Sequence, residues 1–264
     1  MSYLSADDFR VKGEKNILYI TLSVVGVLFL FMLGVSLGFI LLAIIFSAIW
    51  VKIRQGQLLG RCIKVSENQF PEIFKTAKMA ANRLCMSLPD IFVTQDPVIN
   101  AYALGFMGKK SIVLHSATVE AMDAHELLAI IGHEFTHIKA GHTNWLVITN
   151  STEKVQIPII SQITGFIFLF WSRKAEYTSD RGAVLANRDP KATVNALAKL
   201  AVGKELFKNL DIDKLFDQKM NIDEDEICKL SESLSTHPYI INRIHEITKF
   251  YKSPEYSRLS AIIS

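Results

Sequence analysis

A single uncharged stretch near the N-terminus constrains this chain more than any other feature. From Ile17 to Trp50 the sequence has no charged side chain, and most of these residues are apolar. Such a run is longer than the helices that soluble domains bury, so we expect it to meet lipid. One straight helix of this length would be roughly 50 Å long, whereas the hydrocarbon core of a bilayer is about 30 Å thick. The stretch therefore predicts either one long tilted helix or two short spans.

Two features favour two short spans joined by a turn. Gly34 and Gly38 lie at the middle of the stretch, where a tight turn needs small residues. Basic residues flank the stretch on both sides, and these are Arg10, Lys12, Lys15, Lys52, Arg54, Arg61 and Lys64. The positive-inside rule places both flanks in the cytoplasm, which predicts a transmembrane helical hairpin over residues 17–50. A cleaved secretory signal also begins with basic residues, but its apolar region is less than half as long.

The composition outside this stretch narrows the function. Hydrophobic residues make up 50% of the 264 residues and charged residues 21%, which fits a membrane segment joined to a water-exposed domain. The formal net charge is +3 and no basic run is interleaved with aromatic residues, so we expect no nucleic-acid partner. The cysteines Cys62, Cys85 and Cys228 are far apart and form no C-x-x-C pair. They fit a reducing compartment and argue against a disulfide framework or a thiolate zinc site.

The remaining sequence predicts a globular domain over residues 55–264, after a cytoplasmic segment over 1–16 and the membrane segment. The domain is expected to be α+β and mostly helical, with a small β-sheet. A helix is predicted from Ser66, because apolar residues recur there at spacings of three and four. Ile91–Val93 and Ser111–Leu114 are short β-like runs, and the loop between them could turn an antiparallel pair.

The next helix has clear boundary signals. Asp123 and Glu126 predict a capping box at its start, and Gly141 predicts its end after Ala140. A second apolar region follows between residues 145 and 171, and its longest clean run, 15 residues from Ile157 to Trp171, fits either a core helix or a shallow membrane segment. Beyond it we expect a polar helix to Arg188, a helix opened by Asp189-Pro190, a charged solvated stretch over residues 211–226, and a last amphipathic helix after Pro238.

The helix after Asp123 contains His133-Glu134-Phe135-Thr136-His137, an H-E-x-x-H segment. Residues four apart lie on one face of a helix, so both imidazoles can reach one zinc ion. Glu134 follows the first histidine, and from there its carboxylate can take a proton from an activated water molecule. The segment predicts a zinc site with Glu134 as general base, and the alternative is a surface helix with two incidental histidines.

Two histidines leave room for a third protein ligand and for water. Glu176 is the candidate ligand, because it lies on the next strongly helical segment. Asp180 lies one turn further on the same face, where its carboxylate could accept the free N–H of a ligand imidazole. Without the preceding motif these two acids would be interpreted as ordinary solvated charges.

These residues resemble the HtpX and CAAX-prenyl-endopeptidase family, which are membrane zinc metallopeptidases of the gluzincin type with H-E-x-x-H followed by E-x-x-x-D. Asn100-Ala101-Tyr102-Ala103 resembles the N-A-F-A segment beside that family's substrate cleft. Thr236-His237-Pro238 resembles its late T-H-P motif. The resemblance covers roughly Pro89 to His245 and the N-terminal hydrophobic segment.

The resemblance implies a zincin-like fold, one Zn²⁺ per chain and zinc-dependent endoproteolysis. For the HtpX branch it implies quality control of misfolded or damaged membrane proteins at the inner cell membrane, with the active site facing the cytoplasm. A substrate polypeptide is expected to pair with an edge strand, placed at Ser111 to His115. His237 is expected either to donate to the oxyanion of the tetrahedral intermediate or simply to precede a helix. The other histidines are expected to be structural, and these are His115, His125, His142 and His245.

One region departs from the HtpX pattern. HtpX proteins usually carry a second hydrophobic hairpin before the third ligand, and here that region is short and interrupted by Glu153, Lys154 and Pro158. We therefore expect a multi-pass protein with two spans rather than four. A prenyl-protein processing peptidase is an alternative that the few apolar segments disfavour. A catalytically silent membrane scaffold is another, and the intact Glu134 disfavours it.

If residues 17–50 form a hairpin, the turn at Gly34 lies on the opposite side of the membrane from the globular domain. We expect topology reporters fused at Gly34 and at Ser264 to report opposite compartments. Reporters that place both sites on the same side would contradict the hairpin.

Overall fold

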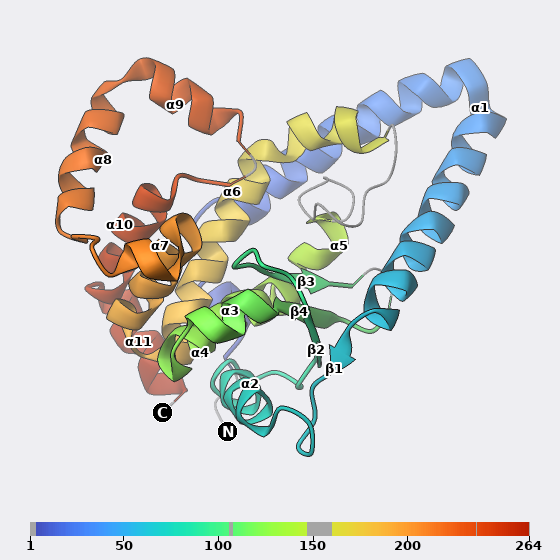
Figure 1. Ribbon diagram of the computed structural model, residues 1–264. Helices are drawn as coiled ribbons and strands as arrows, with labels where there is room; N and C mark the ends of the chain where they lie inside the picture. The colour runs from blue at the N-terminus through green and yellow to red at the C-terminus, as the bar shows by residue number, and fades with distance from the viewer. Residues whose placement is uncertain (1–3, 106–107, 147–159, 236, 264) are drawn as a thin grey trace.

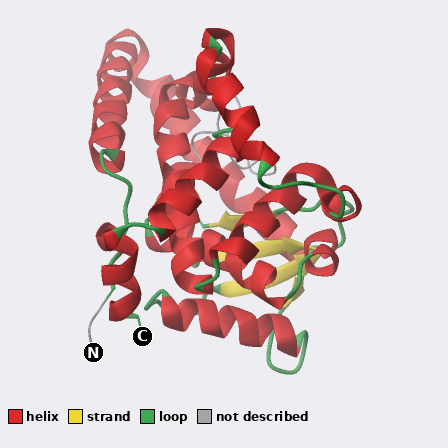
Figure 2. Cartoon of the chain, turned by 90° about the vertical axis from the view of Figure 1, so that its left-hand side faces the viewer, coloured by secondary structure: helices red, strands yellow, loops and turns green. Residues whose placement is uncertain are grey.

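The protein is mostly helical around one small sheet, as the sequence predicts. The structure is a computed structural model and describes residues 4–105, 108–146, 160–235 and 237–263. Figure 1 and, at right angles to it, Figure 2 show the sheet as a small layer packed among the helices. In chain order the described elements are η1 (Ala6–Asp8), α1 (Glu14–Gly60), β1 (Ile63–Lys64), α2 (Pro71–Arg83), β2 (Asp90–Thr94), β3 (Ala101–Leu104), β4 (Ser111–His115), α3 (Ser116–Ala121), α4 (Ala124–Lys139), α5 (His142–Leu146), α6 (Ile160–Asn187), α7 (Pro190–Phe207), α8 (Lys214–Glu224), α9 (Glu226–Ser233), α10 (Ile240–Tyr251) and α11 (Pro254–Ile262).

The sheet has the strand order β1-β2-β4-β3 and mixed directions. β2 and β4 pair in parallel, with Asp90 opposite Ser111, so the predicted antiparallel pairing of these two runs is wrong. The reason is that β3 lies between them in the sequence and itself forms the antiparallel partner of β4. β4 is consequently an internal strand, and the predicted edge position of Ser111 to His115 is also wrong. β3 occupies that edge of the sheet.

The signals at the helix ends are confirmed with one exception. Asp123 and Glu126 form a capping box at the start of α4, and Gly141 follows its end with φ +79°. Asp189 accepts a hydrogen bond from a backbone N–H in the first turn of α7, whose helical course is kinked at Gly203. The helix expected from Ser66 begins five residues later, as α2, because the backbone first closes a tight turn there. Of the second apolar region, residues 147–159 lie outside the described part of the chain.

The apolar helix α1 stands away from the body of the molecule. Figure 1 shows it leaving the body, changing direction at its far end and returning to β1. Among the described residues, the segment Glu14–Gly34 is long and apolar enough to cross a membrane. Its large side chains face outward, for example Phe31, which is 75% exposed. An apolar surface of this extent fits an apolar surrounding. The choice between one span and a hairpin stays a prediction.

The segment before α1 packs into the globular domain. Leu4 and Phe9 are fully buried in the same core as the residues of α2, α4 and the sheet. The start of α1 is thereby fixed to the domain that follows it. The division into residues 1–16, 17–50 and 55–264 stays a prediction. The structure adds that residues of the segment 1–16 contribute to the core of the domain 55–264.

The centre of the fold is the close packing of α4 against α6. Gly132 of α4 faces Ala186 of α6, and Gly182 of α6 faces Thr136 of α4. A Cβ atom at Gly182 would overlap the Thr136 side chain, and one at Gly132 would lie 2.6 Å from the Ala186 Cβ atom. Glycine at both positions therefore sets how near the two backbones come to each other.

We expect Gly182→Ala to destabilise the protein by about 1–3 kcal/mol, because the added methyl group must push the two helices apart. The measurement is thermal unfolding of the purified protein in detergent. Gly56→Ala is the matched control, since a Cβ atom there meets nothing within 4 Å and alanine favours the helix. An equal loss of stability in both variants would contradict the role given to Gly182.

Candidate metal centre

Two histidines of α4 point to the same side of that helix. His133 and His137 are one turn apart, and their Nε2 atoms are 3.1 Å from each other. The helix that carries them is held at its start by the capping box and is buried on most sides. Their positions are therefore set by a rigid element rather than by a loop.

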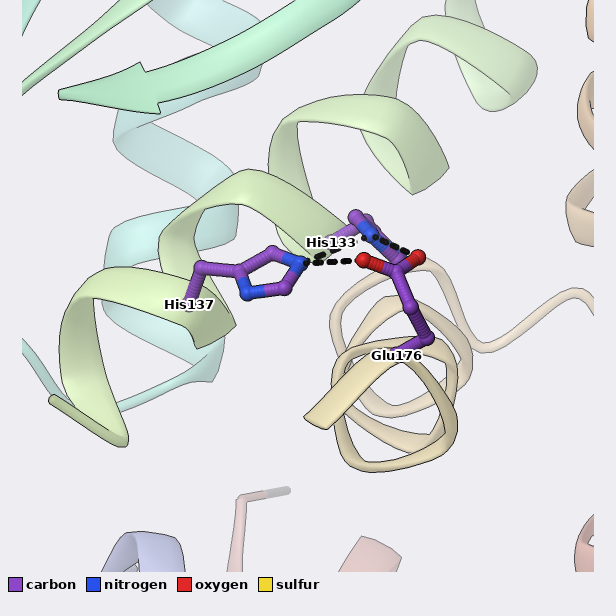
Figure 3. Close-up of side chains that lie close together, drawn as sticks. All are labelled: His133, His137 and Glu176. Carbon is purple, nitrogen blue, oxygen red and sulfur yellow. Dashed lines mark hydrogen bonds and ion pairs between the residues drawn. The ribbon is translucent and has the colours of Figure 1, made fainter. Parts of the chain in front are cut away.

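Glu176 reaches this pair from α6. Its two carboxylate oxygens lie 3.5 Å from His133 Nε2 and 3.4 Å from His137 Nε2. Figure 3 shows the three side chains pointing toward one another from the two helices. All three side chains are at most 12% exposed. The structure thus brings together the three residues that the sequence predicts as ligands.

The geometry of this cluster fits a tetrahedral divalent cation. Ligand atoms about 2.0–2.1 Å from such an ion lie about 3.3 Å from each other, close to the separations seen here. Three protein ligands are the set found in catalytic zinc sites, where the fourth position is open. In the described part of the chain, these three residues form the group of potential ligand atoms that lie within 4.8 Å of one another.

The buried charges around the cluster also suit a divalent cation. Three buried carboxylates face one cavity, and these are Glu134, Glu176 and Asp180. One buried guanidinium, that of Arg243, lines the same cavity and offsets one of these charges. Buried carboxylates therefore outnumber the buried guanidinium, which favours a cation in the cavity.

Asp180 supports the cluster from behind. Its Oδ1 lies 3.1 Å from His133 Nδ1, so it can accept the proton of that ring while Nε2 faces the cluster. Arg243 donates to both oxygens of Asp180, at 2.9 and 2.7 Å, and lies 3.2 Å from Glu176. Burial alone would raise the pKa of Asp180, but the charge and hydrogen bonds of Arg243 lower it.

Glu176 is kept ionised by its neighbours. Burial would raise the pKa of its carboxyl group, but the positive charges of His237 and Arg243 hold that pKa well below its usual range. Burial also opposes a charge on His133, yet Asp180 and Glu176 raise the pKa of that ring to about 10. Without a cation a proton is thus stabilised at the cluster, and metal binding has to displace it.

A cavity of about 200 Å³ opens beside the cluster. Glu134, predicted as the general base, lines this cavity together with His133 and His137. The predicted substrate segment Asn100-Ala101-Tyr102-Ala103 lines it as well, and the last three residues belong to the edge strand β3. The ligand cluster, the expected base and a strand edge therefore share one cavity.

Comparison with known proteins agrees with this arrangement. Residues 67–250 match the sequence model described as peptidase family M48. The chain belongs to peptidase family M48. The likeness to its HtpX-like members, expected from H-E-x-x-H and E-x-x-x-D, is confirmed by two proteins named "Protease HtpX homolog". The one from Streptococcus pyogenes serotype M28 is 24% identical in an alignment 226 positions long that covers 70% of this chain and 75% of that protein. The one from Bacteroides fragilis strain YCH46 is 23% identical in an alignment 291 positions long, gaps included, that covers 95% of this chain and 88% of that protein.

A third relative has a higher identity over a smaller share of its length. The Arabidopsis thaliana protein named "Plastoglobule-localized metallopeptidase 48, chloroplastic" is 33% identical over 216 residues. The alignment covers 76% of this chain and 63% of the Arabidopsis protein. The match therefore spans less than two thirds of that relative.

His237 of the M48 domain lies at the mouth of the cavity. Its Nδ1 is 3.3 Å from a Glu176 oxygen, and its side chain is 51% exposed. The negative charge of Glu176 raises the pKa of His237. Its neighbour Thr236 lies outside the described residues, so of the T-H-P segment the structure places His237 and Pro238.

Two further residues of the M48 domain contact the site and were not predicted to do so. Arg243 could have been noticed, because it falls on the apolar face of the amphipathic helix α10, between Ile240 and Ile244; α10 is not the last helix as expected, since α11 follows it. His142 was expected to be structural, yet its Nδ1 lies 3.1 Å from His137 Nδ1. Burial lowers the pKa of His142 to about 4, against the opposing effect of the hydrogen bond that His142 donates to Glu14, so its ring is neutral near pH 7.

We expect Arg243→Met to destabilise the metal-free protein by roughly 3–5 kcal/mol, because it leaves the Asp180 carboxylate buried without its cation. The measurement is thermal unfolding in detergent with a chelator present. Arg258→Met is the control, since the Arg258 side chain is exposed and the hydrogen bond that it donates to the Asp8 carbonyl group is long, at 3.5 Å. The control should cost at most about 0.5 kcal/mol. Similar losses in the two variants would contradict the role of Arg243.

Proposed function

We propose that this chain is a zinc-dependent endopeptidase, anchored in a membrane, that hydrolyses peptide bonds in polypeptide substrates. The observation that carries the proposal is the convergence of His133, His137 and Glu176 on one point of a cavity that also contains Glu134. Membership of peptidase family M48 supports peptide hydrolysis. A zinc ion held by these three residues would supply Lewis acidity toward water and the scissile carbonyl group.

Glu134 is the general base of the proposed reaction. Its carboxylate removes a proton from the attacking water molecule and later delivers it to the leaving amine. His237 is the candidate donor to the oxyanion that forms on the substrate, because it stands at the cavity mouth and its raised pKa favours the protonated ring. Asp180 orients His133 through its Nδ1 proton, and Arg243 holds Asp180 in place.

The substrate is proposed to bind as an extended strand along β3. β3 forms one edge of the described sheet, and Ala101, Tyr102 and Ala103 line the cavity. Backbone hydrogen bonds to a strand edge do not depend on side-chain identity, which fits broad specificity. The inner wall of the cavity is apolar, and its residues Ala129, Ile130, Ala196, Leu197 and Leu200 come from α4 and α7. An apolar substrate side chain beside the scissile bond fits this wall.

The membrane and the physiological role are also part of the proposal. The candidate span Glu14–Gly34 and its outward-facing apolar side chains support anchoring in a bilayer. The basic flanks of residues 17–50 support a cytoplasmic position for the active site. The proposed role, turnover of misfolded or damaged membrane proteins, is the one that the resemblance to the HtpX branch implies, and the two bacterial relatives are named as HtpX proteases.

We expect Glu134→Gln to retain one zinc per chain while hydrolysis of fluorescent casein falls at least about a hundredfold, because the amide cannot accept the proton. His133→Ala should lose the metal as well as the activity, since only two ligands would be left. Zinc is measured by elemental analysis of the purified protein, and removal of zinc with a chelator should abolish casein cleavage by the wild type.

Glu120→Gln is the matched control for the loss of a carboxylate, because Glu120 is exposed on α3. It should retain both zinc and activity. Wild-type protein that cleaves casein no faster than Glu134→Gln would remove Glu134 from its proposed role. Wild-type protein without zinc would remove the zinc-dependent mechanism.

A further inference from the structure

The far side of His137 is occupied by a second buried histidine. His137 Nε2 faces His133 and Glu176, and His137 Nδ1 lies 3.1 Å from His142 Nδ1. An imidazole that binds a cation through Nε2 keeps its proton on Nδ1, and that proton needs an acceptor. His142 Nδ1 can be this acceptor only if the His142 proton is on Nε2.

The proton on His142 Nε2 finds its own acceptor on the first residue of α1. His142 Nε2 lies 3.0 Å from Glu14 Oε1, so the N–H donates to that carboxylate. One arrangement of the ring protons therefore gives every N–H group an acceptor along the hydrogen-bond chain from His137 through His142 to Glu14. This set is also the one that leaves His137 Nε2 free for a cation.

Burial and further contacts show that this arrangement is built into the fold. His142 and Glu14 are each 1% exposed. Glu14 also accepts hydrogen bonds from Arg10 and from the Thr178 hydroxyl of α6. The same helix α6 also supports His142, whose ring lies edge-to-face against Trp171 at 5.7 Å between centroids. A carboxylate as buried as that of Glu14 has to be fully hydrogen-bonded, so specific donor residues are needed around it.

We propose that Glu14 and His142 are positioning residues that hold His137 in its metal-binding tautomer and orientation. The inference rests on the proposed function, because it assigns a role relative to the zinc ion. It also ties the beginning of the apolar helix α1 to the metal centre through two hydrogen bonds. The metal centre is thus completed by the first residue of the apolar helix α1.

The test is the zinc affinity of purified full-length variants, measured by competition with a chelating dye. His142→Phe keeps a ring of similar shape but offers no acceptor, and it should bind zinc about 10- to 100-fold more weakly. His142→Asn places its amide oxygen near the position of Nδ1 but loses the bond to Glu14, so its affinity should lie between those of the phenylalanine variant and the wild type. Cobalt-substituted protein should show an altered visible absorption spectrum in the phenylalanine variant.

His115→Phe is the matched control, because it makes the same replacement at a histidine that is 2% exposed and bonds to the Val98 carbonyl group instead. It should bind zinc as the wild type does. Equal affinities of His142→Phe and wild type, or equal losses in the His142 and His115 variants, would overturn the inference while leaving the proposed function intact. Wild-type protein that binds no zinc would overturn both.

Glu14→Gln provides a second measurement if His142→Phe does not fold. The amide keeps an oxygen toward His142, but a neutral acceptor holds the N–H less strongly than a carboxylate. Zinc binding should weaken about tenfold. An unchanged affinity in Glu14→Gln would remove Glu14 from the positioning pair.

Discussion

The metal centre depends on how closely α4 and α6 pack. Two histidines on one helix can face the same point, but a third ligand has to come from another element at a fixed distance. Gly132 and Gly182 allow the two backbones to approach until Glu176 reaches both imidazoles. The same approach places Asp180, one turn after Glu176, against the other nitrogen of His133. The helix pair α4 and α6 therefore supplies all three ligands and also Asp180, which orients His133.

This packing buries charges that must be balanced where they lie. Three buried carboxylates line one cavity, and Arg243 balances one of them. Burying charge is unfavourable unless each group is paired and hydrogen-bonded. A divalent cation would offset the excess of carboxylates, so the polar network and the ligand set are consistent with the same occupant. The site is thus specified twice, by the geometry of its ligand atoms and by the charge of their surroundings.

The N-terminal segment links the apolar helix to this network. Leu4 and Phe9 are buried in the domain core, and Glu14 lies in a buried cluster with His142 and Thr178. α1 therefore begins inside the domain, leaves it with its apolar side chains exposed, and returns to it at β1 (Figure 1). A chain organised in this way keeps the cavity at a constant place relative to the apolar helix. This suits an enzyme whose substrates lie in or near a bilayer.

Much of the site could be predicted from the sequence because its signals are local. The spacing of His133 and His137 follows from the pitch of one helix, and the capping box at Asp123 marks where that helix starts. The mostly helical fold and the family likeness also followed from short motifs.

The sheet was predicted less well, since the parallel pairing of β2 with β4 and the edge position of β3 depend on contacts between separate strands. The contact of Arg243 with Asp180 joins residues 63 positions apart, and that of Glu14 with His142 joins residues 128 positions apart, so no local pattern encodes them. The sequence by itself determined which residues can bind a cation, because helix geometry is repeated at every turn; only the tertiary structure decided what surrounds them, because that depends on how distant helices pack.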